Sequence, residues 1–202
     1  GEITGFTPAI EVQQSTNATI SEIFAHGGDR GINVGTGAGH LIEKNIIQDY
    51  GRDAIKIDGT AGATITKNVV SNSVFGIGIA GGATGTVVQK NVVSTSRDWG
   101  IALWGSASGT VLDKNVVSQT VRDGILVQSD TSGTVLTKNE AYTNGDDGIE
   151  VASASASLGK NLAVGNAQLG IDAVEGVTDL GGNRAAGNGD AAQCTGVVCS
   201  AP

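Results

Sequence analysis

The sequence of 202 residues lacks methionine and has only two prolines and few aromatic residues. It contains no apolar run long enough to cross a membrane, and no apolar pattern with the 3.6-residue period of a helix. Basic residues are also scarce, because twelve lysines and arginines stand against twenty acidic residues, for a formal net charge of −8. These absences argue against a membrane protein, a helical fold and a general nucleic-acid-binding protein.

Glycine is abundant instead, with 32 residues, and it marks a repeat. A Gly-Ile or Ala-Ile pair recurs every 22–24 residues, beginning at Ala9, Gly31, Ala54, Gly76, Gly100, Gly124, Gly148 and Gly170. An asparagine recurs in step with it, at Asn45, Asn68, Asn91, Asn115, Asn139, Asn161 and Asn183. Two columns that keep one period over this length indicate a solenoid of stacked coils.

Each repeat contains three short β-type runs, for example residues 101–103, 110–112 and 116–117. Each run is too short to bury its apolar face alone, whereas stacking identical runs buries them and pairs the backbone with neighbouring coils. A leucine-rich repeat has a similar period, but its L-x-x-L-x-L-x-x-N frame does not fit this sequence. We therefore predict an all-β fold, a parallel β-helix solenoid of about eight coils with three strands each.

We expect a single domain over residues 1–202. Residues 1–8 would form a partial N-terminal coil, residues 9–183 the repeats, and residues 184–202 a C-terminal loop with a cysteine pair. The asparagine column predicts a ladder, in which the same bend of every coil carries an asparagine that hydrogen-bonds its neighbours. We also expect these asparagines to adopt the left-handed backbone of a tight bend.

The Gly-Ile-x-Val and Lys-Asn-Val-Val register resembles the right-handed parallel β-helix repeats of the pectate-lyase-like superfold. That group includes polysaccharide lyases, uronan epimerases, NosD-like periplasmic proteins and other secreted proteins. The segment from Gln193 to Cys199 also resembles the tail of secreted bacterial proteins of this kind. The resemblance implies a right-handed coil and leaves the activity open, because one fold hosts many chemistries. Two motifs of the group are absent, the Asp-Pro-His-Glu of alginate epimerases and the Asp-Asp, His and Arg-x-Lys set of polygalacturonases.

The two cysteines, Cys194 and Cys199, lack the partner ligands of a zinc site. A disulfide that closes the last coil is expected, with two free thiols as the alternative, and a disulfide would imply an oxidising, extracellular or periplasmic setting. Because the sequence begins at Gly1, we expect a leader to have been removed. The open N-terminal end is expected to meet either a partner domain or another solenoid end.

The bend before each repeat opening carries charges that alternate in sign. Asp29 stands over Arg52, and Asp98 over Arg122 over Asp146, which predicts a salt-bridge column. The alternative is an active-site groove, because the resembled lyases react on the outer face beside the first strand. In that case the base or electrostatic clamp would come from Lys56, Arg97 or Arg122, and calcium would bind to the acidic residues Asp123, Asp146, Asp147 and Glu150.

Two further features suggest ligand binding. Trp99 and Trp104 flank one first strand and would pack against sugar rings, although Phe75 one coil below predicts a stack with Trp99 instead. Six lysines precede the column asparagines and predict a like-charged row, of which Lys90 and Lys114 are the central members. They either fill an exposed position or bind an extended polyanion.

Two functions remain open from the sequence. The first is a secreted β-helix module that binds an extended polysaccharide or serves as a structural or adhesive scaffold, without chemistry of its own. The second is a calcium-dependent polyuronate lyase or epimerase that acts at the Asp/Arg-rich bend. The even repeat length favours the first, because enzymes of this fold usually wall their groove with long loops.

Overall fold

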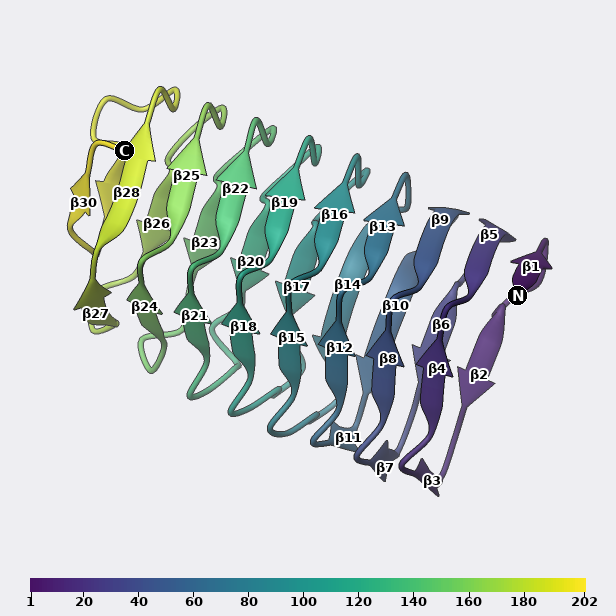
Figure 1. Ribbon diagram of the computed structural model, residues 1–202. Helices are drawn as coiled ribbons and strands as arrows, with labels where there is room; N and C mark the ends of the chain where they lie inside the picture. Colours follow the sequence, from purple (N-terminus) through teal and green to yellow (C-terminus); the bar gives the residue numbers. More distant parts are fainter.

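The computed structural model describes all 202 residues and shows a solenoid whose two ends lie at opposite ends of a stack of coils (Figure 1). The chain forms β-strands and no helix, so no helix suited to crossing a bilayer is present. Every strand pairing is parallel and joins one coil to the next. Three long sheets run along the stack, and they are called sheets I, II and III here in the order in which a coil visits them.

Sheet I is formed by the first strand of each coil. Its nine strands are β2 (Ile10–Val12), β6 (Ile32–Val34), β10 (Asp53–Asp58), β14 (Phe75–Ala80), β17 (Ile101–Leu103), β20 (Ile125–Val127), β23 (Ile149–Val151), β26 (Ile171–Ala173) and β29 (Cys194–Thr195). A short three-stranded sheet follows it at the next bend of the early coils, and its strands are β3 (Ser15–Thr16), β7 (Gly37–Ala38) and β11 (Thr60–Ala61).

Sheets II and III complete the coil. Sheet II consists of β4 (Thr19–Ser21), β8 (Leu41–Glu43), β12 (Thr64–Thr66), β15 (Val87–Gln89), β18 (Val111–Asp113), β21 (Val135–Thr137), β24 (Ser157–Gly159) and β27 (Thr178–Gly181). Sheet III consists of β1 (Glu2–Thr4), β5 (Phe24–Gly28), β9 (Ile46–Tyr50), β13 (Val69–Ser71), β16 (Val92–Ser94), β19 (Val116–Ser118), β22 (Glu140–Tyr142), β25 (Leu162–Val164), β28 (Asn183–Ala186) and β30 (Cys199–Ser200).

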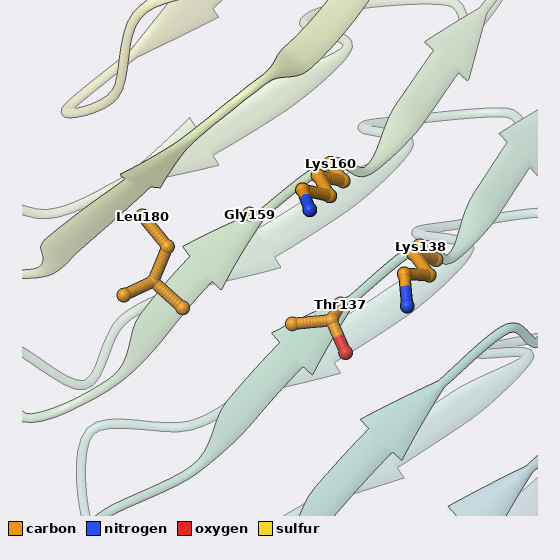
Figure 2. A pocket seen from close by; sticks show the side chains of 5 residues that line it. All are labelled: Thr137, Lys138, Gly159, Lys160 and Leu180. Atoms are coloured by element: carbon orange, nitrogen blue, oxygen red, sulfur yellow. The ribbon is translucent and has the colours of Figure 1, made fainter.

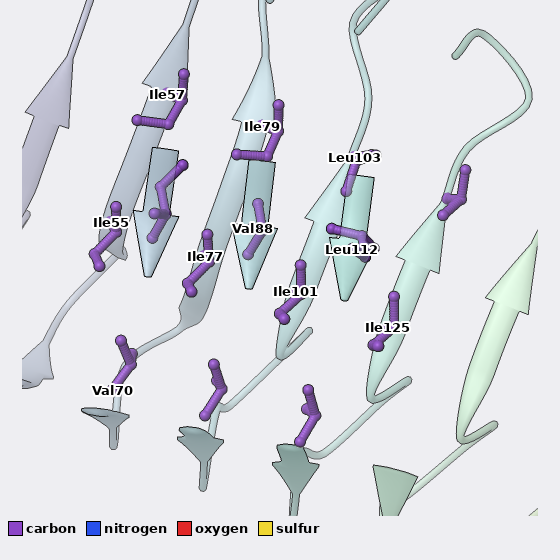
Figure 3. Close-up of a cluster of buried hydrophobic side chains, with 14 of the residues drawn as sticks. Ile55, Ile57, Val70, Ile77, Ile79, Val88, Ile101, Leu103, Leu112 and Ile125 are labelled. Atoms are coloured by element: carbon purple, nitrogen blue, oxygen red, sulfur yellow. The ribbon is translucent and has the colours of Figure 1, made fainter. Parts of the chain in front are cut away.

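The core consists of stacks in which the same residue type occupies the same position in successive coils. In sheet I, Ile55 pairs with Ile77, Ile77 with Ile101, and Ile101 with Ile125, and all four are fully buried. Figure 3 shows these isoleucines in line along neighbouring strands, with side chains of sheet II such as Leu112 facing them. Because every coil places the same branched side chain at the same position, a repeat of short strands builds one continuous core.

The predicted asparagine ladder is present at the bend between sheets II and III. Asn115 is fully buried, and its Nδ2 donates to Asn139 Oδ1 and to the carbonyl of Val88, both at 2.9 Å. The prediction about the backbone was wrong, because the left-handed residue is the one before each asparagine. This residue is a lysine in six coils, for example Lys114 with φ 57°, and it is Gly182 before Asn183. The asparagine side chain points inward and is held on both sides, so the strained conformation falls on the residue that faces solvent.

A second ladder, at the bend between sheets III and I, was not predicted. Asn144 donates to Asn166, Asn166 to Asn188, and Asn188 to Gln193, each through Nδ2 at 2.9 Å. Thr120 extends the ladder by one coil through its hydroxyl. This second ladder is confined to the last coils, and its asparagines are not preceded by a recurring lysine. Its pattern in the sequence is therefore weaker than that of the first ladder.

The residues expected to form a C-terminal loop carry short strands that continue the sheets. β29 pairs with β26 of sheet I, and β30 pairs with β28 of sheet III. Cys194 and Cys199 form the expected disulfide and thereby connect these two last strands. The last coil is thus closed covalently where it has no further coil to pair with.

Candidate functional site

The outer face of sheet I changes its chemistry from coil to coil. The central outward residues of its strands form a row: Glu11, Asn33, Lys56, Gly78, Ala102, Leu126, Glu150, Asp172 and Thr195. Neighbours in this row are about 4.8 Å apart, because the strands pair in register. The middle of the row is small and apolar, and the later coils are acidic.

Three aromatic side chains, Phe75, Trp99 and Trp104, gather over the small residues and are called the aromatic platform here. The rings of Phe75 and Trp99 stack with centroids 5.5 Å apart, as predicted, and Trp104 tilts against Phe75 at 6.4 Å. Gly78 makes room for Trp104, since a Cβ there would lie 2.6 Å from the indole ring. The platform is half-buried, so its rings keep exposed surface.

An acidic cluster lies on the coils next to the platform and consists of Asp123, Asp146, Asp147 and Glu150. Carboxylate oxygens of the three aspartates lie within 4.8 Å of one another. Asp123 and Asp147 precede β20 and β23 and are only 4% and 8% exposed. Each accepts a backbone hydrogen bond from the next coil, Asp123 from Asp147 at 3.1 Å and Asp147 from Leu169 at 2.7 Å.

Burial and mutual repulsion raise the pKa values of this cluster. Burial is the largest cause for Asp147, and with the nearby carboxylates it raises the pKa to about 6 against the backbone hydrogen bond from Leu169. Burial, the charge of Asp123 and a hydrogen bond to Asp123 raise the pKa of Glu150 to about 7. Burial also raises the pKa of Asp123. Near neutral pH, the cluster therefore holds a proton that ordinary carboxylates would release.

One open pocket of about 330 Å³ joins the platform to the acidic cluster. Its lining residues are Trp99, Arg122, Asp123, Leu126, Gln128, Ser129, Asp146, Glu150 and Ala152. Arg122 lies between the two groups, with its guanidinium 5.6 Å from the Trp99 ring and its Nε 3.0 Å from Asp98. A ligand in this pocket would touch an aromatic ring, an amide, a hydroxyl and carboxylates at once.

The three aspartates fit a hard divalent cation. Calcium binds carboxylate oxygens at about 2.5 Å, so two oxygens on one ion lie at most about 5 Å apart. The oxygens of Asp123, Asp146 and Asp147 meet this limit. Glu150 lies in the same pocket and hydrogen-bonds Asp123, so it is within reach as a further ligand or as a proton carrier.

The three predicted basic residues do not converge. Arg122 lines the pocket but is paired with Asp98. Lys56 lies three coils away, where it pairs with Asp58 at 3.2 Å and lies 5.9 Å from the Trp104 ring. Arg97 is exposed and donates to the carbonyl of Tyr50, outside the pocket.

The predicted alternating salt-bridge column forms only in part. Arg122 pairs with Asp98, whereas Arg52 makes no ion pair with Asp29, and Asp146 lies in the acidic cluster instead. The pair that forms near Arg52 is Arg30 with Asp53 at 3.5 Å. Side chains on a solvated bend gain little from pairing, so stacking of the backbone does not force the charges together.

The residues predicted to bind a ligand fall on two separate surfaces. Trp99 and Trp104 belong to the platform on sheet I. Lys90 and Lys114 are exposed at the bend between sheets II and III, which is not an edge of sheet I. Sequence reasoning missed Leu126 and Ser129 as pocket residues, although stacking the repeats in register places both beside the acidic cluster.

The family of the chain follows from its sequence and agrees with this architecture. The family model for the right handed beta helix region matches residues 2–117 and 31–188, which together cover most of the chain. The chain belongs to the right-handed β-helix family. The resemblance read from the repeats is thereby confirmed, and so is the right-handed coil. No curated protein sequence matches this β-helix.

Solved structures of similar shape include enzymes that act on polysaccharides. A variant of the periplasmic alginate epimerase AlgG has a TM-score of 0.74 at 17% identity, over 94% of this β-helix and 56% of its own chain. Pectate lyase Pel9A gives 0.67 at 14% identity, over 92% and 56%. An alginate lyase from Paenibacillus sp. str. FPU-7 gives 0.64 at 14% identity, over 98% and 88%. The β-helix thus spans little more than half of the first two, and likeness at these identities shows the fold alone.

Proposed function

We propose that this β-helix binds an extended polysaccharide along the outer face of sheet I. The observation that carries the proposal is the pocket that joins the aromatic platform to the polar residues of the next two coils. Sugar rings pack against aromatic faces, and hydroxyl groups pair with carboxylates and amides such as Gln128. The straight row of the outer face suits a linear chain, with successive sugars on successive coils.

Tryptophan substitutions test this proposal. We expect Trp99→Ala and Trp104→Ala each to weaken binding about tenfold, the effect of losing an aromatic stacking contact. Val69, a half-exposed apolar residue on sheet III, provides the matched control as Val69→Ala. Binding of neutral and acidic oligosaccharides would be followed by titration calorimetry. Equal binding by all three variants and the parent chain would refute the assignment of this face.

Acid–base chemistry is the second candidate function, and the position of Glu150 in the pocket beside the three aspartates favours it. Lyases and epimerases of uronates begin by taking the proton beside the sugar carboxylate, and a carboxylate that lines the binding pocket can act as the base for this step. A polyuronate would be repelled by the acidic cluster unless a cation neutralised both. Calcium held by Asp123, Asp146 and Asp147 would supply that charge, so we propose calcium dependence for this activity.

Two assays cover this second candidate. A lyase would produce unsaturated uronate, which is seen by ultraviolet absorbance, and an epimerase would change the sugar configuration, which is seen by nuclear magnetic resonance. We expect Glu150→Gln to abolish either activity and Glu175→Gln, at an exposed position, to keep it. Lack of product from a panel of polyuronates with calcium would refute catalysis on those substrates and leave the binding function standing.

The disulfide bears on where this function takes place. Cys194 and Cys199 are joined in the last coil, and disulfides persist in oxidising compartments. We propose that the protein is exported and meets its polysaccharide outside the cytoplasm.

A further inference from the structure

A row of lysines runs along the bend between sheets II and III, far from the pocket on sheet I, and is called the lysine stripe here. Its members are Lys44, Lys67, Lys90, Lys114, Lys138 and Lys160. All six are exposed, and they are six of the seven lysines of a chain whose formal net charge is −8. Nearly all of the lysine charge of an acidic protein is thus placed in one line.

The backbone fixes the spacing of the stripe. Each lysine amide donates to a carbonyl of the next coil, for example Lys90 to Asp113 at 3.0 Å and Lys114 to Thr137 at 3.0 Å. The strands on both sides pair in register, so adjacent lysines are about 4.8 Å apart. Six positions therefore form a straight line about 24 Å long, from five such steps.

The fold does not require lysine at these positions. All six lysines have φ between 55° and 59°, a conformation that glycine adopts most readily. The equivalent position is Gly182 in a later coil and Glu22 in the first, so the bend accepts other residues. Lysine here costs conformational stability, and a row of like charges adds repulsion. Neither the backbone conformation nor the charge repulsion favours lysine at these positions, yet lysine recurs six times. This recurrence points to a role for the charge.

The stripe is largely free of neutralising partners. Only Lys114 forms an ion pair, with Asp113 at 3.7 Å. The residues that precede Lys67, Lys90, Lys138 and Lys160 are neutral, whereas Glu43 and Asp113 border the other two. Lys138 and Lys160 extend side by side from adjacent coils (Figure 2). They line a hollow of about 230 Å³ together with Thr137, Gly159 and Leu180.

We propose that the lysine stripe is a second binding surface, which takes an acidic polysaccharide in extended form. A single row of evenly spaced cations matches a single polymer strand with one anionic group per sugar, and each ammonium would meet one such group. The hollow beside Lys138 and Lys160 would receive part of the sugar ring. This surface shares no residue with the sheet I face, so the proposal does not depend on the function proposed above.

Charge-removing substitutions test the stripe against matched controls. The double variant Lys90→Gln with Lys114→Gln removes two central charges, and Lys90→Gly with Lys114→Gly removes them while favouring the left-handed backbone. Arg52→Gln removes a charge from an exposed, unpaired arginine at another bend. Circular dichroism and thermal melting would establish that each variant is folded, and the glycine pair keeps the test valid if the glutamine pair is destabilised.

The probe is fully de-esterified polygalacturonate oligomer, with its methyl ester as the neutral control. Binding is compared in chains that also carry Trp99→Ala and Trp104→Ala, so that the sheet I face contributes little. We expect both double variants to bind about tenfold more weakly, the effect of losing two exposed charge pairs. We expect Arg52→Gln to bind like the parent, and binding of the acid form to weaken steeply with salt. Binding that ignores both salt and the substitutions would overturn the proposal. Equal binding of the methyl ester would overturn it as well, and equal binding of single-stranded DNA of the same charge would overturn the assignment to a polysaccharide.

Discussion

The acidic cluster predicts that this β-helix becomes less stable as the pH rises from about 4 to about 7, the window between the ordinary and the raised pKa values of its carboxyl groups. Glu150 has a pKa raised from 4.5 to about 7, and Asp147 one raised from 3.8 to about 6. Between its ordinary and its raised pKa, each group binds a proton more tightly in the folded chain than in the unfolded chain. Stability therefore falls with rising pH in this window and is level above pH 7 as far as these groups are concerned.

The size of the effect follows from the same values. For Glu150, the change from 4.5 to about 7 corresponds to about 3 kcal/mol, at about 1.4 kcal/mol per pH unit. Glu150 is partly exposed, so solvent screening reduces this to about 1–2 kcal/mol. Asp147 is better buried and changes the stability in the same direction. Its contribution cannot simply be added to that of Glu150, because the charge of each group affects the titration of the other.

Urea unfolding at a series of pH values measures this effect. We expect Glu150→Gln to lower the pH dependence by about 1–2 kcal/mol between about pH 4 and about pH 7, because glutamine keeps the shape and removes the charge. Glu175→Gln, at an exposed position, should follow the parent chain at every pH. A parent chain whose stability is constant or rises over this range, or a Glu150→Gln variant with an unchanged slope, would refute the reasoning.

Two further predictions concern the ladder and the cation. Asn115→Ala should destabilise the chain by about 2–4 kcal/mol in urea unfolding, because it removes the acceptor of the buried Asn91 amides and a donor to the Val88 carbonyl. A milder loss would mean that the ladder adds little to stability. Calcium at ten times its dissociation constant should stabilise the parent chain by about 1.4 kcal/mol at pH 7.5, and thermal melting should show no such gain in a variant carrying Asp123→Asn and Asp147→Asn.

The repeat columns were sufficient to predict the fold, because each column position has one environment. A residue that recurs every 22–24 positions occupies the same place in each coil, so its burial and its neighbours follow from the period alone. The pairing of Phe75 with Trp99 followed from the same register. Within a bend, however, the sequence does not state which residue turns inward, and the left-handed conformation was assigned to asparagine when it belongs to lysine.

The sequence predicted which acidic residues lie together at the candidate site, but not which basic residue joins them or how burial changes their pKa values. Stacking placed Asp123, Asp146 and Asp147 together, as expected. Which basic residue reaches the pocket depends on side-chain direction, which register does not fix, and only Arg122 of the three does so. The raised pKa of Glu150 depends on burial by the neighbouring coils, a property that no motif carries.

The regularity of the coils leads to a last prediction, about ligand length. The repeat spacing varies by only two residues, so no long loop encloses the pocket, and its floor is made of side chains from stacked strands. Affinity must then come from many weak contacts along the axis, with each added sugar reaching one more coil. We expect binding to strengthen progressively from disaccharide to hexasaccharide in titration calorimetry. A plateau at the disaccharide would instead identify a single closed subsite and contradict the extended mode of binding, whichever of the two surfaces is engaged.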